Sequence, residues 1–339
     1  MRILVTGGAG FIGAHYVRSL LADEYPGAEG ASVTVLDLLT YAGNRANLPV
    51  EHPRLEFVQG DVCDMELLAE LLPGHDAVVH FAAESHVDRS IEGAADFVRT
   101  NVLGTQTLME AARHNGVGRV VHVSTDEVYG SIEEGAWDEH EPLAPNSPYA
   151  ASKAGSDLIV LANARTHGLD AVVTRCSNNY GPYQHPEKLI PRFTTDLLEG
   201  RKVTLYGDGR NVREWLHVSD HCRAVHLALT KGRAGEIYNI GGGNELTNIE
   251  ITESLLQLCG ADRSAIDWVA DRLGHDRRYA VDDSKIRTEL GYEPIVPFEE
   301  GLRHTVAWYR DHSCWWRPLR EAADGGSAEG GTVEVDACR

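Results

Sequence analysis

The sequence lacks several features that would direct its interpretation elsewhere. Its six cysteines include no Cys-x-x-Cys pair, and no His/carboxylate triad accompanies His86, His217 or His275, so no metal site is predicted. No apolar stretch approaches the roughly 20 residues of a membrane span, so no membrane partner is expected. Positive charge is scarce: 31 Lys and Arg against 51 Asp and Glu give a formal net charge of −20. Such an acidic chain is not expected to bind nucleic acid.

The start of the chain is also not expected to direct export. After Met1-Arg2 the apolar run covers only residues 3–5 before the glycines begin, which is too short for the core of a signal peptide. A cytoplasmic location is therefore expected. A length of 339 residues allows one large domain or two closely joined ones.

The first half of the sequence alternates apolar runs with helical stretches. Strands are predicted at residues 3–6, 33–37, 55–59, 77–81, 119–124 and 171–175, and helices at 13–23, 65–72, 95–115 and from Pro148 onward. Continuously apolar strands that alternate with helices are typical of a parallel sheet covered on both faces. The fold class predicted is therefore α/β, with a Rossmann-type doubly wound parallel sheet.

The second half is less regular and predicts a smaller α+β lobe that returns once to the sheet. We expect the Rossmann domain to comprise residues 1–175 plus about 218–242, and the lobe 176–217 plus about 243–320. The last segment, residues 321–339, is rich in Gly and acidic residues and is expected to be disordered.

The glycines after the first predicted strand indicate a dinucleotide site. Gly7, Gly10 and Gly13 permit a tight turn and close backbone approach, and the following helix N-terminus can receive a pyrophosphate. Asp37 ends the second strand, where a carboxylate accepts hydrogen bonds from both ribose hydroxyls and repels a 2′-phosphate. NAD is therefore predicted rather than NADP.

Two pairs of functional residues follow later strands. Tyr149 and Lys153 are four residues apart and share a helix face, where an ammonium can favour a phenolate base. Asp126 and Glu127 place two carboxyl groups at the end of the fifth strand. A Tyr base suits oxidation of an alcohol, and an added acid and base suit elimination of water from a neighbouring carbon.

Several longer motifs resemble those of the dTDP-glucose 4,6-dehydratases, a family of extended short-chain dehydrogenases/reductases. They are Ala82-Ala83-Glu84-Ser85-His86-Val87-Asp88-Arg89-Ser90, Ser124-Thr125-Asp126-Glu127-Val128-Tyr129-Gly130, Ser177-Asn178-Asn179-Tyr180-Gly181-Pro182-Tyr183, Pro186-Glu187-Lys188-Leu189-Ile190-Pro191 and Gly274-His275-Asp276-Arg277-Arg278-Tyr279. The resemblance extends from Met1 to about Tyr309. One departure is Leu273, where the family usually has Pro.

The resemblance implies a dTDP-sugar substrate and tightly bound NAD that is recycled in each turnover. It implies that Tyr149 with Lys153 is the base for oxidation at C4, with Thr125 hydrogen-bonding the 4-hydroxyl, that Asp126 is the acid that protonates the departing 6-hydroxyl and that Glu127 is the base that removes the C5 proton. The implied cofactor-binding residues are Gly7, Gly10, Phe11, Ile12, Gly13, Asp37, Leu38, Leu39, Thr40, Asp61, Val62, Phe81, Ala82, Ala83, Ser85, Thr100, Tyr149, Lys153 and Asn179. The implied substrate-binding residues are Ser85, Thr125, Asp126, Glu127, Asn178, Glu187, Lys188, Leu189, Thr204, Leu205, Tyr206, Arg213, Asn248, Arg272, His275, Asp276, Arg277 and Tyr279.

Two other functions compete with this interpretation. A nucleotide-sugar 4-epimerase of the same fold needs Tyr149 and Lys153 but no acid and base for elimination. A non-catalytic NAD-binding protein could dispense with Tyr149 and Lys153 altogether, whereas this sequence retains both. The helices at 95–115 and 148–165 carry apolar stripes on two sides, which predicts a homodimer formed through a helix bundle.

Overall fold

A computed structural model of the chain describes residues 1–271 and 275–324. Its centre is a seven-stranded sheet in the order β3-β2-β1-β4-β5-β6-β10, and every neighbouring pair is parallel. The strands are β1 (Arg2–Thr6), β2 (Ser32–Asp37), β3 (Leu55–Gln59), β4 (Ala77–His80), β5 (Arg119–Thr125), β6 (Ala171–Cys176) and β10 (Ile237–Ile240). The predicted doubly wound α/β fold is confirmed.

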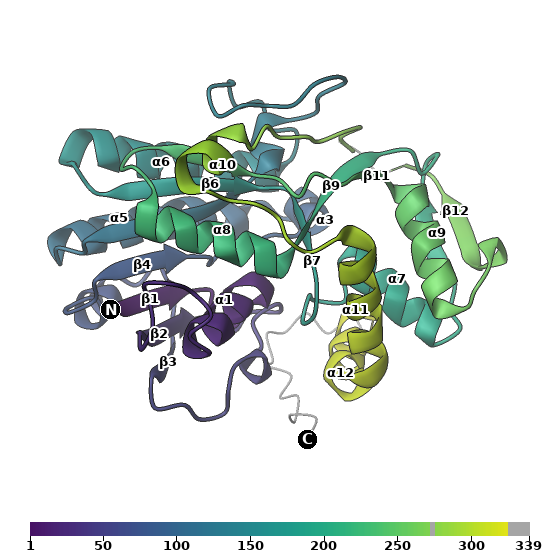
Figure 1. Cartoon of the computed structure of the whole chain (residues 1–339), viewed down its shortest axis with the longest axis horizontal. Helices are drawn as coiled ribbons and strands as arrows, with labels where there is room; N and C mark the ends of the chain where they lie inside the picture. Colours follow the sequence, from purple (N-terminus) through teal and green to yellow (C-terminus); the bar gives the residue numbers. More distant parts are fainter. Residues whose placement is uncertain (272–274, 325–339) are drawn as a thin grey trace.

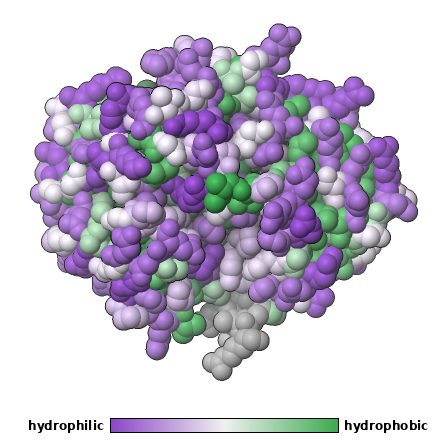
Figure 2. Space-filling model, in the orientation of Figure 1, coloured by the Kyte–Doolittle hydropathy of each residue, from purple (hydrophilic) through white to green (hydrophobic). Residues whose placement is uncertain are grey.

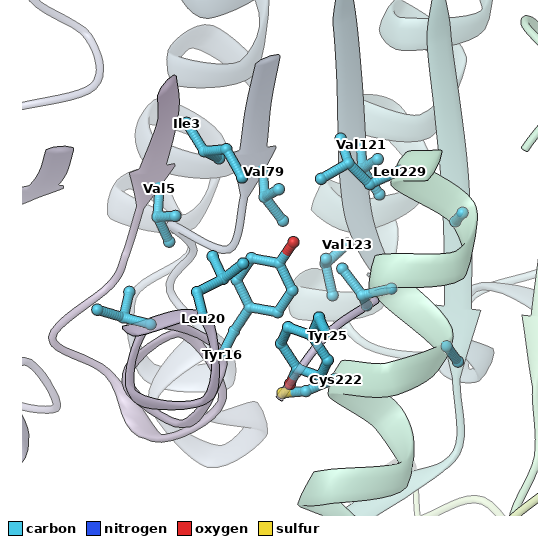
Figure 3. Close-up of a cluster of buried hydrophobic side chains, with 14 of the residues drawn as sticks. Ile3, Val5, Tyr16, Leu20, Tyr25, Val79, Val121, Val123, Cys222 and Leu229 are labelled. Atoms are coloured by element: carbon cyan, nitrogen blue, oxygen red, sulfur yellow. The ribbon is translucent and has the colours of Figure 1, made fainter. Parts of the chain in front are cut away.

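Helices cover both faces of the sheet (Figure 1). One face carries α1 (Phe11–Leu21), α8 (Val218–Lys231) and α10 (Ser284–Leu290), and the other carries α2 (Met65–Leu71), α5 (Thr105–His114) and α6 (Pro148–His167). Successive residues of a strand point to opposite faces. Ile3 and Val5 accordingly pack under α1 and α8, whereas Leu4 packs under the other layer. Figure 3 shows Tyr16 and Leu20 of α1 meeting Cys222 and Leu229 of α8 over the strands.

A second lobe lies beside the sheet and is built from short strands and longer helices (Figure 1). Its strands are β7 (Asn178–Tyr180), β9 (Val212–His217) and β11 (Glu245–Thr247) in one sheet, and β8 (Val203–Tyr206) with β12 (Ile266–Val269) in another. Its helices are α7 (Leu189–Leu198), α9 (Asn248–Cys259), α11 (Phe298–Asp311) and α12 (Ser313–Asp324). Phe193, Leu205 and Leu255 belong to a separate core within this lobe. The exact division into two domains stays a prediction.

Short helical segments complete the described chain. They are α3 (Val87–Glu92), α4 (Ala95–Phe97), η1 (Arg45–Asn47), η2 (Val98–Gly104), η3 (Asp126–Tyr129) and η4 (Arg263–Ala265).

The helix predicted over residues 95–115 is confirmed as one unbroken helical run over residues 95–114. Its middle, η2, is a π-helix between α4 and α5. There the buried Asn101 side chain accepts from the Glu84 N–H at 2.9 Å and donates to the Glu84 carbonyl at 3.0 Å. A π-turn often occurs at a functional site; here it brings Asn101 to the segment after β4, which a periodicity pattern does not encode.

Helix α12 includes the first residues of the segment 321–339, which the sequence predicts to be disordered. Helix α12 continues to Asp324, and residues 325–339 lie outside the described part of the chain. The helix is held by Trp315 and Trp316, which are buried against Tyr309, and the Trp316 indole N–H donates to the Tyr309 carbonyl at 2.7 Å. Two adjacent Trp residues therefore anchor the helix before the Gly-rich segment begins.

The surface is largely hydrophilic on the face that Figure 2 shows. Hydrophobic residues are interspersed among the hydrophilic ones on this face (Figure 2). Within the described ranges, none of the helices combines the length and hydropathy that crossing a bilayer requires.

Candidate active site

The glycine turn after β1 is shaped for close contact. Gly7 has a φ of +69°, and a Cβ placed there would lie 2.5 Å from the Ala82 backbone N. At Gly13 a Cβ would lie 2.3 Å from the Gly7 carbonyl oxygen. Gly10 is the N-cap of α1 and offers no side-chain acceptor to the N–H groups of the first turn. Those donors and the helix dipole favour an anion at this end of the helix.

Asp37 lies at the end of β2 beside this turn. Its carboxylate accepts from the backbone N–H of Ala9 at 2.9 Å and of Leu39 at 2.8 Å. Burial raises the pKa of Asp37, and the two hydrogen bonds oppose that shift. The carboxylate is thereby fixed at the carboxyl edge of the sheet, where β1 separates β2 from β4 and the strand order reverses.

A cavity of about 310 Å³ runs along this edge and brings together both predicted sets of residues. Of the predicted cofactor-binding residues, those that line it are Gly7, Gly10, Phe11, Ile12, Gly13, Asp37, Leu38, Thr40, Asp61, Val62, Phe81, Ala82, Ala83, Ser85, Thr100, Tyr149, Lys153 and Asn179. Leu39 is absent from this lining. The predicted substrate-binding residues in the lining are Ser85, Thr125, Asp126, Glu127, Asn178, Glu187 and Lys188.

The carboxyl pair begins directly where β5 ends. Thr125 is the N-cap of η3, and its hydroxyl accepts from the Glu127 N–H at 3.3 Å and donates to Asp126 Oδ1 at 3.2 Å. Asp126 is only 2% exposed, whereas Glu127 is half-buried. Burial, then Glu127 and Glu214, raise the pKa of Asp126 well above its usual range. A carboxylic acid that keeps its proton at neutral pH can act as a proton donor.

Tyr149 and Lys153 lie in the first two turns of α6, whose N-cap is Ser147. The Lys153 ammonium is buried and donates to the Val123 carbonyl of β5 at 2.7 Å. Burial lowers the pKa of Lys153 to about 8, against the opposing effect of Asp157.

The sequence predicts that Lys153 lowers the pKa of Tyr149, and the structure gives the opposite net direction. Burial, then the Glu127 carboxylate, raise the pKa of Tyr149 well above its usual value, while a hydrogen bond with Thr125 lowers it. The spacing of Tyr149 and Lys153 could not reveal how much charge the neighbouring η3 brings to the phenol.

Glu187 and Lys188 precede α7 and join the second lobe to the segment after β4. The Lys188 ammonium donates to the Ser85 carbonyl at 2.8 Å. The Glu187 carboxylate lies 3.7 Å from both the His86 imidazole and the Arg89 guanidinium. These contacts hold Glu187 and Lys188 in the lining of the cavity. The next residue, Leu189, is the first of α7.

A second polar cluster gathers the remaining predicted residues around Arg213. Its guanidinium is buried, donates to the Asp276 carbonyl at 3.0 Å and lies 4.4 Å from the Tyr279 ring centroid. The Asn211 amide donates to the same carbonyl, and the Asn211 carbonyl accepts from the Asn248 N–H at 2.9 Å. The motifs around residues 213, 248 and 276 therefore meet in one place, although they are far apart in the sequence.

Other predicted substrate residues lie toward the outside of this lobe. Tyr206 is exposed on β8 next to Thr204 and Leu205, and its ring meets that of His275 edge-on at 6.4 Å. The Arg277 guanidinium forms two hydrogen bonds with Asp208, at 2.9 and 3.1 Å. Arg272 lies outside the described residues.

The cavity also contains residues that the sequence did not predict, including Glu84, Cys176, Ser177, Gln184 and His185. Cys176 and Ser177 directly follow the predicted strand 171–175, and Glu84 stands in the motif after the fourth strand, whereas Gln184 and His185 lie between two motifs. Position near a strand end could have found the first three but not Gln184 and His185. In the parts of the chain that the structure describes, His, Cys, Asp and Glu form no group that could hold a metal ion.

Fold and site together define an extended short-chain dehydrogenase/reductase, with a dinucleotide turn, a Tyr-Lys pair and a second lobe. The family model described as GDP-mannose 4,6 dehydratase matches residues 4–305. A dTDP-glucose 4,6-dehydratase of Streptomyces niveus is 62% identical over 94% of this chain and 96% of its own.

Solved structures give the same result. DesIV of Streptomyces venezuelae, a dTDP-glucose 4,6-dehydratase with NAD and TYD bound, has a TM-score of 0.93 and 65% identity, covering 94% of this chain and 100% of its own. A UDP-glucose 4-epimerase from Thermotoga maritima has a TM-score of 0.85 and 34% identity, covering 92% and 99%. The chain belongs to the GDP-mannose 4,6-dehydratase family, and its predicted resemblance to the dTDP-glucose 4,6-dehydratases is confirmed.

Proposed function

We propose that this protein dehydrates dTDP-glucose to dTDP-4-keto-6-deoxyglucose with NAD as a recycled cofactor. The observation that carries the proposal is the buried acid Asp126, which shares one cavity with Glu127, Tyr149 and Lys153. Relatives with the same activity, at 62% and 65% identity over 94% of the chain, support it.

The cavity fits NAD. Gly7 and Gly13 leave no room for a Cβ, so the backbone can approach a pyrophosphate at the start of α1. Asp37, with its fixed carboxylate, would hold the adenosine ribose, and its negative charge disfavours a 2′-phosphate. When bound, NAD would supply a cationic acceptor for the C4 hydride and, in its reduced form, a hydride donor for C6.

Oxidation at C4 needs a base for the hydroxyl proton. We assign this role to Tyr149, which has a hydrogen bond with Thr125 and shares helix α6 and the cavity with Lys153. Burial and Glu127 disfavour the phenolate form of Tyr149. The positive charge of Lys153 favours that form and offsets part of the free-energy cost of ionising Tyr149. Lys153 is in turn held in place by the Val123 carbonyl.

Elimination across C5 and C6 needs a base and an acid on neighbouring carbons. The 4-ketone acidifies the C5 proton, which Glu127 removes, and Asp126 protonates the departing C6 hydroxyl. A buried, protonated Asp126 suits the acid, and the half-buried Glu127 suits the base. We assign the dTDP moiety to the Arg213 cluster, where Arg213 and Asn248 offer donors to a diphosphate.

We also propose that the protein is a homodimer. Val98, Leu103 and Leu158 are each more than half exposed; Val98 and Leu103 line an apolar groove together with Ile159 of α6, the neighbour of Leu158 in the sequence. Such an exposed patch on two neighbouring helices suits an isologous contact with a second copy. The cytoplasmic location expected from the sequence stays a prediction, which cell fractionation would test.

The decisive experiment is to identify the product. Purified protein incubated with dTDP-glucose should yield the 4-keto-6-deoxy sugar without added NAD, as read by mass spectrometry and NMR. Parallel reactions with UDP- and CDP-glucose measure the preference for the base. Recovery of dTDP-galactose alone would favour the epimerase, and no sugar conversion with full NAD occupancy would favour a non-catalytic NAD-binding protein.

A further inference from the structure

Glu214 is a buried carboxylate with a dedicated set of donors. It lies on β9 and is only 4% exposed. Its Oε2 accepts from the Ser177 hydroxyl at 2.8 Å, and its Oε1 accepts from the Gly243 N–H at 2.8 Å. The Val281 N–H adds a longer contact of 3.4 Å. A Cβ at Gly241 would lie 2.6 Å from Oε1, so the glycine segment is shaped around this carboxylate.

The sheet register brings Glu214 toward the catalytic acid. Thr125 of β5 is paired with Cys176 of β6, so Asp126 and Ser177 are the next residues on two adjacent strands. Both line the cavity, and Ser177 donates to Glu214. The hydrogen bond therefore fixes a second buried negative group at the strand ends where Asp126 begins η3.

The charges around Asp126 come from four elements. Glu127 faces it from η3, Glu214 and Arg213 from β9, Tyr149 from α6 and Cys176 from β6. Burial, then Glu127 and Glu214, raise the pKa of Asp126, and the Thr125 hydrogen bond and Arg213 oppose that shift. Asp126 Oδ2 is buried and has no hydrogen-bond partner among the described residues, so it can carry a proton.

More hydrogen-bond donors stabilise the ionised form of Glu214 than that of Asp126. Burial and, to a smaller extent, the Asp283 carboxylate raise the pKa of Glu214, whereas Gly243, Ser177 and Val281 all donate to it and oppose that shift. Asp126 has one side-chain donor, Thr125. Between these two buried carboxyl groups, the negative charge is therefore better accommodated on Glu214 and the proton on Asp126.

We infer that Glu214 is a positioning residue for elimination: its fixed negative charge keeps the proton on Asp126, and so makes Asp126 rather than Glu127 the acid. This inference rests on the proposed dehydration. In that step the C5–H electrons form the C5–C6 double bond as Glu127 takes the proton. The C6–O electrons leave with oxygen, which takes the Asp126 proton and departs as water.

The test is the pH dependence of product formation in Glu214→Gln, which removes the charge but keeps an amide oxygen as acceptor. Loss of the negative charge should lower the pKa of Asp126. In a plot of kcat against pH, the fall in kcat at high pH, here called the alkaline limb, should therefore occur about one pH unit lower. At pH values above the alkaline limb, product formation by Glu214→Gln should be about tenfold slower than by wild type. Single-turnover oxidation at C4 should stay within about twofold of wild type, so reduced nicotinamide accumulates.

Three further variants make the test specific. Glu214→Asp keeps the charge and should retain the wild-type limb. Ser177→Ala removes a hydrogen bond that stabilises the ionised form of Glu214. It should therefore move the alkaline limb in the same direction by a smaller amount. This variant provides the test if Glu214→Gln fails to fold. Glu139→Gln removes a partly buried carboxylate that accepts from the Asn239 N–H at 2.9 Å, and its limb should not move.

The inference is overturned if the alkaline limb is unchanged in folded Glu214→Gln or, should that variant not fold, in Ser177→Ala. It is also overturned if Glu139→Gln or Glu214→Asp moves the limb as far as Glu214→Gln. Failure of the wild-type protein to form the 4-keto-6-deoxy sugar would instead reject the proposed function, so the two failures are distinguishable.

Discussion

Asp157 of α6 and Arg175 of β6 form an ion pair, with 2.9 Å between the Arg175 Nε and the Asp157 Oδ2, and both side chains are at most 2% exposed. Arg175 also donates to the Tyr129 hydroxyl at 2.8 Å, and the His122 ring lies 3.4 Å from Asp157. The pair joins the helix of Tyr149 and Lys153 to the strand that leads into Ser177. Nearby cations and a His122 hydrogen bond hold the pKa of Asp157 below its usual value, despite burial.

Asp157→Ala should therefore destabilise the protein strongly. Removing one partner leaves a buried, uncompensated guanidinium, which costs about 3–5 kcal/mol of unfolding free energy. Asp267→Ala is a matched control, because Asp267 pairs with Lys202 at 2.9 Å and both side chains are more than half exposed. That variant should lose less than about 1 kcal/mol. Chemical denaturation measures both values, and equal losses would contradict the role given to the buried pair.

Lys153→Met should slow the oxidation at C4. The substitution removes the buried cation next to Tyr149 and keeps a side chain of similar length. Product formation should fall by roughly 10²–10⁴-fold, the usual contribution of acid–base assistance. Lys202→Met changes a surface lysine and should keep full activity. Stopped-flow absorbance of reduced nicotinamide measures the step, and wild-type oxidation in Lys153→Met would exclude the proposed role.

The double variant Asp126→Asn with Glu127→Gln should separate oxidation from elimination. Both substitutions preserve shape and remove the acid and the base, whereas Tyr149 and Lys153 remain. We expect reduced nicotinamide to accumulate while product formation falls by about 10²-fold or more. The single variants divide the effect between the two residues. Unchanged turnover in the double variant would remove both from the mechanism.

Much of the fold was predictable because strand order and helix cover follow from repeated apolar runs. Gly7, Asp37 and Tyr149 were likewise recognisable from their positions after strands. Glu214 was not, because its role depends on Ser177 and Gly243, which approach it only after β9 folds against β7 and the glycine segment. The π-turn at Asn101 and the raised pKa of Tyr149 were missed for the same reason, since both arise from tertiary contacts.

Leu103→Glu should weaken the proposed dimer. Leu103 is 52% exposed and lines the apolar groove on η2, so a charge there should oppose association. Ile295→Glu is the control, because Ile295 is 64% exposed and lies outside that groove. Light scattering over a concentration series should show a dimer for wild type and Ile295→Glu and a shift toward monomer for Leu103→Glu. A wild-type monomer at all concentrations would refute the dimer.

Gly13→Ala should damage the cofactor site more than the rest of the fold. Its Cβ would lie 2.3 Å from the Gly7 carbonyl, so the glycine turn must move away from α1. We expect a loss of about 1–3 kcal/mol in stability and at least about tenfold weaker retention of NAD.

Gly93→Ala provides the control for this change, because a Cβ there meets nothing within 4 Å and its φ of −155° suits any residue. Equilibrium dialysis of the released nucleotide measures NAD retention, and thermal unfolding measures stability. If Gly13→Ala kept NAD as tightly as Gly93→Ala, close contact between turn and helix would not be what shapes the pyrophosphate site. The close approach of Gly13 to Gly7 would then matter only for the packing of α1 on β1.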